Sequence, residues 1–198
     1  MDKSNNNETA QSRRRFVKRT AVGAALVSLP VKSVWANGIT NSIVASGHGS
    51  DWANGAQINL LGPGYWRQNA DTNFLSQTFF DVFGGPALKR DGSEHDSSVT
   101  LNDILSVYAI DSSDRTNDQK DLIGKRHYNS RMIAMYLNAE YGRNAMNAHN
   151  VVYPVANGRP FIDAEAFSRQ LYLRTSATFE DSGHQLGLLI KNDHEYML

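Results

Sequence analysis

Cysteine is absent from all 198 residues of the sequence. This absence excludes disulfide bonds, thiolate metal ligands and cysteine nucleophiles. The sequence also lacks a Gly-x-Gly-x-x-Gly motif, a P-loop and a Gly-x-Ser-x-Gly elbow, so no motif in it indicates nucleotide binding or serine-hydrolase chemistry. No apolar run reaches the roughly 20 residues that a membrane-spanning helix requires, so no transmembrane segment is expected.

The formal net charge is zero, but this value averages two unlike regions. Residues 1–36 contain seven Lys or Arg and two Asp or Glu, whereas residues 37–198 contain thirteen basic and eighteen acidic side chains. A mildly acidic body has no electrostatic feature that favours nucleic acid, and we expect no nucleic-acid partner. The basic excess of the first region therefore needs its own explanation.

The basic residues belong to an ordered N-terminal series. A charged stretch over residues 12–18 is followed by an apolar run over 21–31 and then by the small residues Val34 and Ala36. The charged stretch resembles the twin-arginine export signal, Ser/Thr-Arg-Arg-x-Phe-Leu-Lys, and differs from it only where Val17 replaces Leu. The residues that carry the match are Ser12, Arg13, Arg14, Phe16 and Lys18.

This resemblance implies export through the twin-arginine (Tat) translocase, which carries proteins that have already folded. It also implies removal of residues 1–36 by a signal peptidase that cleaves after Ala36, leaving one mature domain over 37–198. The expected destination is the periplasm, the cell surface or the extracellular space. The alternative is a basic helix on a membrane surface or a nucleic-acid arm, which would not explain the order of charge, apolar run and small residues.

Apolar spacing and capping residues predict a mainly α-helical mature domain with about four helices. The Gly-rich segment 37–64 is expected to form either two short strands, at 42–45 and 57–61, or an irregular wrap over the core, and the segment 185–190 is a further candidate strand. Polar residues predict loops over 88–99 and 111–118, and an extended link over 147–159. The predicted helices cover residues 72–83, 100–110, 119–141 and 164–174.

The most distinctive mature segment is Leu-Leu-Gly-Pro-Gly-Tyr-Trp-Arg-Gln-Asn, residues 60–69. Its Gly-Pro-Gly sequence predicts a turn that brings Tyr65 and Trp66 together beside Arg67. Adjacent aromatic rings next to a cation could stack on a sugar or hold a partner's side chain. The alternative is that both rings fill the bottom of the core.

Three stretches of the mature region resemble a domain of bacterial secreted and cell-surface proteins that has the motif Pro-Gly-Tyr-Trp-Lys-Asn-His. Residues 63–69 correspond to this motif, with Arg67, Gln68 and Asn69 in place of its Lys, Asn and His. Residues 101–105 and 133–139 correspond to its Leu-rich segment and to its Leu-Asn-Ala helix end. The resemblance implies an adhesive or matrix setting, with a surface protein or a polysaccharide as partner, and implies no reaction.

The sequence contains only weak candidates for metal ligands. None of the six histidines has the His-x-x-x-His or His-Glu-x-x-His spacing that places two imidazoles on one helix face. Glu94, His95 and Asp96 form the best local nucleus, and Asp111 and Asp114 offer oxygen ligands of the kind that calcium prefers. The alternative, a pair of solvated polar loops, needs no ion, and no cofactor is predicted.

Three hypotheses for function follow from the sequence. The first is a non-enzymatic, exported surface module that serves adhesion, matrix or assembly. The second is a periplasmic metal-binding enzyme or accessory subunit that is exported folded. The third is a carbohydrate-binding module that uses Tyr65 and Trp66.

Overall fold

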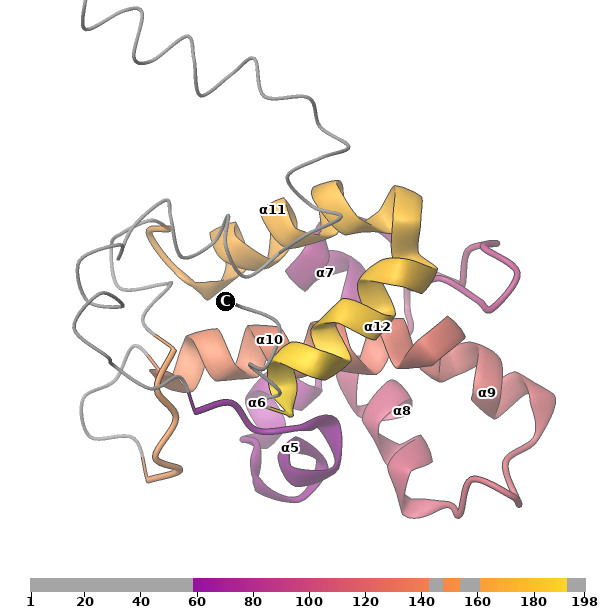
Figure 1. The fold of residues 1–198 in the computed structure, drawn as a ribbon, viewed down its shortest axis with the longest axis horizontal. Helices are drawn as coiled ribbons and strands as arrows, with labels where there is room; N and C mark the ends of the chain where they lie inside the picture. The colour runs from indigo at the N-terminus through magenta and orange to yellow at the C-terminus, as the bar shows by residue number, and fades with distance from the viewer. Residues whose placement is uncertain (1–58, 143–147, 154–160, 192–198) are drawn as a thin grey trace, which may run out of the picture. The chain divides into compact units, whose positions relative to one another are not determined.

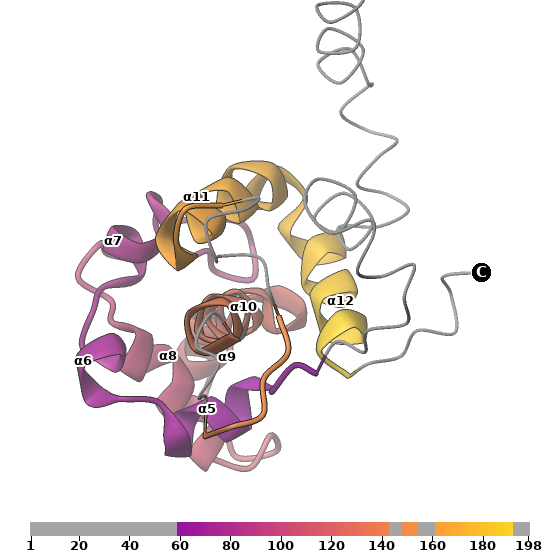
Figure 2. The same cartoon turned by 90° about the vertical axis from the view of Figure 1, so that its left-hand side faces the viewer.

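The fold is organised around α10 (Tyr128–Gly142), the longest helix in the part of the chain that the computed structural model describes, residues 59–142, 148–153 and 161–191. From Tyr128 to Ala139 every residue except Arg131 is buried. A helix that is buried all round belongs in the interior of a domain rather than on its surface. Figure 2 shows α10 end-on, with the other helices placed around it.

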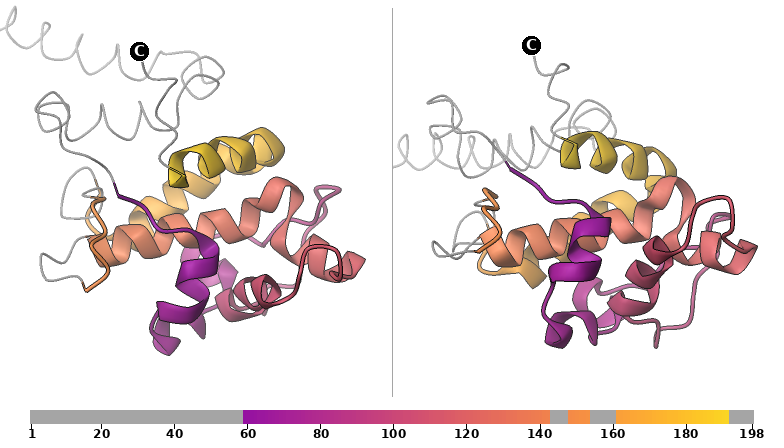
Figure 3. Two further views of the ribbon diagram at one scale, coloured as in Figure 1. Left: turned by 60° about the horizontal axis from the view of Figure 1, so that its bottom comes forward. Right: turned by 90° about the horizontal axis from the view of Figure 1, so that it is seen from below.

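Shorter helices cover α10. In Figure 2, α11 (Ala164–Thr175) lies above α10 and α12 (Phe179–Ile190) lies to its right. Figure 3 shows α12 on one side of α10 and α5 (Pro63–Asn69) and α8 (Leu101–Ser106) on the other. Helix α7 (Phe79–Phe83) packs against α11, and α9 (Asn117–Ile123) packs against α8 (Figure 1). The prediction of a mainly helical domain is confirmed.

β-structure is limited to isolated bridges in the described residues, one of which pairs Asn59 with Val152. The predicted strand at 57–61 is therefore wrong for its described part, residues 59–61. Of the extended link expected over 147–159, residues 148–149 form a turn and Val152 pairs with Asn59, while residues 147 and 154–159 lie outside the described residues. Residues 185–190 are helical as part of α12, so their strand alternative is also wrong. The candidate strand at 42–45 and the export signal lie outside the described residues.

The predicted helix over 72–83 is two helices, α6 (Thr72–Leu75) and α7. Between them the chain runs beside residues 99–101, where the Leu101 N–H donates to the Gln77 carbonyl at 3.0 Å and the Phe79 N–H donates to the Val99 carbonyl at 2.8 Å. The Thr78 side chain then caps α7 by accepting from the Asp81 N–H. These bonds replace the helical ones that a continuous helix would have made.

The predicted helix over 119–141 is also broken. Helix α9 ends at Ile123, and Gly124 follows with φ 75° and ψ 167°. A Cβ atom at this position would lie 3.0 Å from the Asn129 amide nitrogen and 3.1 Å from the Leu88 carbonyl. Glycine is therefore required both by its backbone conformation and by the close approach of its neighbours.

Several expectations about helix ends are confirmed. Thr100 and Asp103 form the capping box that opens α8, and Asp163 caps α11 by accepting from the Ala166 N–H. The expected turn at Gly62-Pro63-Gly64 is instead a helix start. Pro63 occupies the first position of α5, where its missing N–H leaves no helical bond unmade.

Two buried asparagines of α10 join distant segments to it. Asn129 accepts from the Leu88 N–H at 3.0 Å and donates to the Leu88 carbonyl at 2.8 Å. Asn138 makes the same pair of bonds with Leu61, both at 2.8 Å. Nine residues correspond to about 2.5 turns and about 13.5 Å of helix, so the two amides hold chain segments on opposite faces of α10.

We expect Asn138→Ala to lower the free energy of unfolding by about 2–4 kcal/mol, because it leaves the Leu61 N–H and carbonyl without partners. Urea unfolding followed by circular dichroism measures this change. The control is Asn102→Ala at an exposed position of α8, which should change stability by less than about 0.5 kcal/mol. Equal effects of the two substitutions would contradict this role of Asn138.

Candidate functional site

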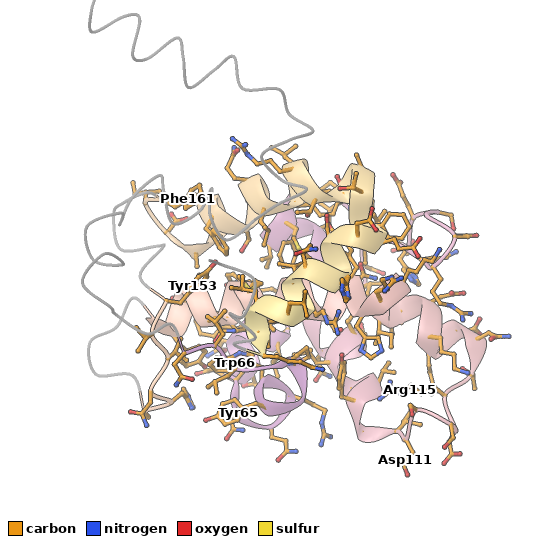
Figure 4. The ribbon with its side chains drawn as sticks, viewed as in Figure 1. Tyr65, Trp66, Asp111, Arg115, Tyr153 and Phe161 are labelled. Carbon is orange, nitrogen blue, oxygen red and sulfur yellow. The ribbon has the colours of Figure 1, made fainter. Side chains whose placement is uncertain are left out.

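The aromatic pair predicted at residues 65–66 is divided between surface and core. The Trp66 side chain is fully buried, with 0% exposure, and stacks on Tyr141 of α10 at a centroid distance of 4.8 Å. Tyr65 and His149 meet the Trp66 ring by their edges (Figure 4 labels both residues of the pair). The Trp66 ring faces are therefore covered, as the core alternative predicted.

Tyr65 keeps 37% of its surface exposed. Its hydroxyl lies 2.8 Å from Nδ1 of His149, which the sequence did not single out because it lies 84 residues away. Among the described residues, the Trp66 Nε1 and the Arg67 Nε are buried and have no hydrogen-bond partner. Of the predicted set Tyr65, Trp66 and Arg67, only Tyr65 offers an aromatic surface to a ligand.

Two of the three metal candidates at 94–96 are engaged in hydrogen bonds, His95 with α9 and Asp96 within its own loop. The His95 Nε2 lies 3.0 Å from the Asp121 carbonyl, and the Asp96 carboxylate accepts from the Ser98 N–H at 2.8 Å. The hydrogen bonds from Ser98 lower the pKa of Asp96. Glu94 is exposed and makes no ion pair within the described residues.

Asp111 and Asp114 lie together at a turn, where the Asp114 N–H donates to the Asp111 carbonyl at 2.9 Å. Both are exposed, and the loop leads directly to Thr116, whose side chain caps α9. Across residues 59–142, 148–153 and 161–191, no group of three or more His, Asp or Glu side chains could hold a metal ion. The loop alternative for both segments agrees with these contacts.

Tyr108, His127 and Ser130 form a polar cluster, the Tyr108 cluster. The Tyr108 hydroxyl lies 2.8 Å from the His127 Nδ1 and 3.1 Å from the Ser130 Oγ. The Ser130 hydroxyl donates to the His127 carbonyl at 3.0 Å. Because each hydroxyl has one hydrogen, Tyr108 donates to Ser130, and the His127 Nδ1 donates to Tyr108. The imidazole is therefore held in one orientation, with its hydrogen on Nδ1.

Two arginines face this cluster. The Arg115 guanidinium carbon lies 5.2 Å from the centre of the Tyr108 ring, and its Nε donates to the Ile110 carbonyl at 3.0 Å. The Arg131 NH1 group donates to the carbonyls of Arg126 at 2.9 Å and Gly183 at 2.6 Å. Figure 4 shows Arg115 in the polar loop, near Asp111.

The electrostatics of the cluster disfavour the imidazolium form. Burial is the largest cause that lowers the pKa of His127, followed by the positive charges of Arg131 and Arg115. Burial likewise raises the pKa of the Tyr108 hydroxyl and lowers that of the Arg131 guanidinium. At neutral pH the imidazole is therefore uncharged and its Nε2 carries a lone pair.

The backbone at this cluster is unusual. Arg126 and His127 both have positive φ, 50° and 61°, which non-glycine residues rarely adopt in succession. Helix α12 packs close to them at Gly183, where a Cβ would lie 3.2 Å from the Lys125 and Arg126 carbonyls. Nothing in the sequence announces this cluster, since its members are single polar residues up to 22 positions apart.

Comparison with protein-family models, with curated protein sequences and with solved structures finds no match to this chain. In the described part of the chain, none of the helices combines the length and the apolar character needed to cross a bilayer. The resemblance to the Pro-Gly-Tyr-Trp-Lys-Asn-His domain and to the twin-arginine signal therefore stays a sequence-based hypothesis.

We expect Trp66→Ala to lower the free energy of unfolding by about 3–5 kcal/mol, because it removes a large buried ring and leaves a cavity. Tyr65→Phe removes only an exposed hydroxyl and should cost less than about 1 kcal/mol. Thermal and urea denaturation of the two variants test this difference. A Trp66→Ala variant with unchanged stability and lost polysaccharide retention would instead support the sugar-binding hypothesis.

The lowered pKa of His127 predicts a pH dependence of stability. The unfolded chain binds a proton near pH 6.5, whereas the folded protein binds it only at lower pH, so acidification favours the unfolded state. Stability should fall as the pH decreases from 6.5 towards the folded pKa, at no more than about 1.4 kcal/mol per pH unit. His127→Asn, which tolerates positive φ, should flatten this slope in urea titrations between pH 7.5 and 5.

Proposed function

We propose that the protein is exported in the folded state by the twin-arginine route and acts outside the cytoplasm as a non-enzymatic binding or assembly module. The ordered series of charge, apolar run and small residues over 12–36 is the basis for export. The cleaved product would begin at Asn37 and act in the periplasm, at the cell surface or in the extracellular space.

The proposal of a non-enzymatic role rests on where the fold places the three stretches that resemble the surface domain. They lie in α5, α8 and α10, and these three helices pack against one another. Their most distinctive side chains perform structural tasks: Trp66 is buried, Asp103 completes a capping box and Asn138 binds Leu61. The structural tasks of these three side chains support a framework role for the shared pattern.

Export in the folded state agrees with the way the domain is closed. The Asn138–Leu61 pair spans 77 positions, and the Tyr172 hydroxyl donates to the Pro86 carbonyl, 86 positions away, at 2.8 Å. Such contacts form only when both parts of the chain are present. A translocase that carries folded proteins would preserve these contacts during transport.

Replacing both Arg13 and Arg14 by Lys should abolish export while leaving the fold intact, because the translocase reads the paired guanidinium groups. Cell fractionation with immunoblotting would show the uncleaved chain retained in the cytoplasm. Arg15→Lys, at the variable position of the motif, is the matched control and should be exported. N-terminal sequencing of the exported product should begin at Asn37.

Elemental analysis of the same exported product separates this proposal from the hypothesis of a metal enzyme. A protein without stoichiometric metal agrees with the module, whereas one transition metal per chain would contradict it. Export that survives the double Lys substitution would contradict the proposed route.

A further inference from the structure

Positive charge surrounds the Tyr108 cluster: the Arg115 guanidinium carbon lies 5.2 Å from the centre of the Tyr108 ring, and Arg131 binds the carbonyl of Arg126, next to His127. The charges of both arginines help to lower the pKa of His127. Arg115, His127 and Arg131 come from a loop, a 3-10 turn and α10, respectively. Within the described residues, no Asp or Glu oxygen lies within ion-pair distance of Arg115 or Arg131. Partly buried like charges repel one another, and this repulsion is relieved when an anion lies between them.

The acidic groups nearest along the chain or across the packing are engaged elsewhere or exposed. On α12, Glu180 pairs with Lys125 and Arg126 rather than with Arg131. In the polar loop, Asp114 accepts from the Ser113 hydroxyl at 3.2 Å, and Asp111 is exposed. Among the described residues, no carboxylate therefore forms an ion pair with Arg115 or Arg131.

The donors of the cluster are fixed in direction. The Arg115 Nε and the Arg131 NH1 bind backbone carbonyls, which orients both planar guanidinium groups. Each arginine keeps further N–H donors for which the described residues supply no partner. The His127 Nδ1 is committed to Tyr108, so a proton added to the ring goes to Nε2 and creates a third donor.

A close fit between α12 and α10 holds Arg131 in place. The Arg131 guanidinium group lies directly against the α12 backbone at Gly187, where a Cβ atom would displace it from this position. Gly183, one helical turn earlier, admits the carbonyls that precede His127. The two glycines of α12 thus form a notch in which the guanidinium group lies against the helix backbone.

We propose that Arg115, His127 and Arg131 form a binding site for an oxyanion, either a free phosphate, sulfate or carboxylate or such a group on a larger ligand. Guanidinium groups match the paired oxygens of these anions, and an imidazolium Nε2 adds a third charge-assisted hydrogen bond. Bound anion stabilises the imidazolium, so anion binding and protonation of His127 favour each other. This site does not depend on the proposed function.

NMR titration of the full-length protein with inorganic phosphate, inorganic sulfate and acetate, at constant ionic strength set with chloride, tests the site. Saturable shifts of the His127 imidazole signals, together with an upward shift of the His127 pKa, are the expected result. Preference among the three probes distinguishes a tetrahedral anion from a carboxylate. Shifts that do not saturate, or that depend on ionic strength alone, would overturn the proposal.

Arg115→Gln removes one guanidinium charge and should weaken binding of the preferred anion at least fivefold, while Arg115→Lys should retain part of it. The matched control is Arg90→Gln, an exposed arginine whose Nε already pairs with Asp121 at 2.7 Å. Anion binding by the Arg90→Gln variant should be unchanged. Equal losses in the Arg115 and Arg90 variants, or no loss in either, would overturn the site, and the titration of the unmodified protein tests it independently of any variant.

Discussion

The buried amide groups of α10 are the interaction on which the rest of the structure depends. A central helix that is covered on all sides gains from apolar burial, but any polar side chain on it must find its partners inside the protein. Asn129 and Asn138 do so by binding both the N–H and the carbonyl of one residue in a covering segment. Each amide thereby makes the two backbone hydrogen bonds that a neighbouring strand would make, and it fixes the point where an irregular segment crosses the helix.

This arrangement explains how a domain with short outer helices has a defined interior. Several covering elements are a few residues long, such as α6 and α7, and helices of this length are not stable by themselves. Their positions come from contacts with α10 and with one another, including the bridge between Thr78 and Thr100. The order of these segments is therefore a property of the assembled domain and not of each segment alone.

Helix α10 contributes to both candidate sites, the aromatic group at Trp66 and the Tyr108 cluster. At its C-terminal end Tyr141 stacks on Trp66 and accounts for the burial of that ring. At its N-terminal end Ser130 and Arg131 complete the surroundings of His127. The first region fills the core and leaves only Tyr65 at the surface, whereas the second concentrates positive charge with little local compensation.

Prediction of the candidate sites from the sequence succeeded unevenly, for identifiable reasons. Adjacent aromatic residues stand out in a sequence, so Tyr65 and Trp66 were found, but their burial depends on Tyr141 and His149, which are far away along the chain. The cluster at His127 has no such local sign. Its geometry requires two successive residues with positive φ, stabilised by packing against α12, and no residue pattern encodes that.

By itself, the sequence determined the helical class, the capped starts of α8 and α11, the loop at 88–99 and the loop at 111–118 up to Thr116, because cap residues and apolar spacing act within a few positions. Only the tertiary structure decided where helices break, since the bonds that interrupt them at Thr78 and Gly124 come from other parts of the chain. It also decided which polar side chains lie together. The physical reason is the same in both cases: a local pattern fixes the conformation that a segment prefers, whereas the partners available to its buried polar groups are set by the assembled fold.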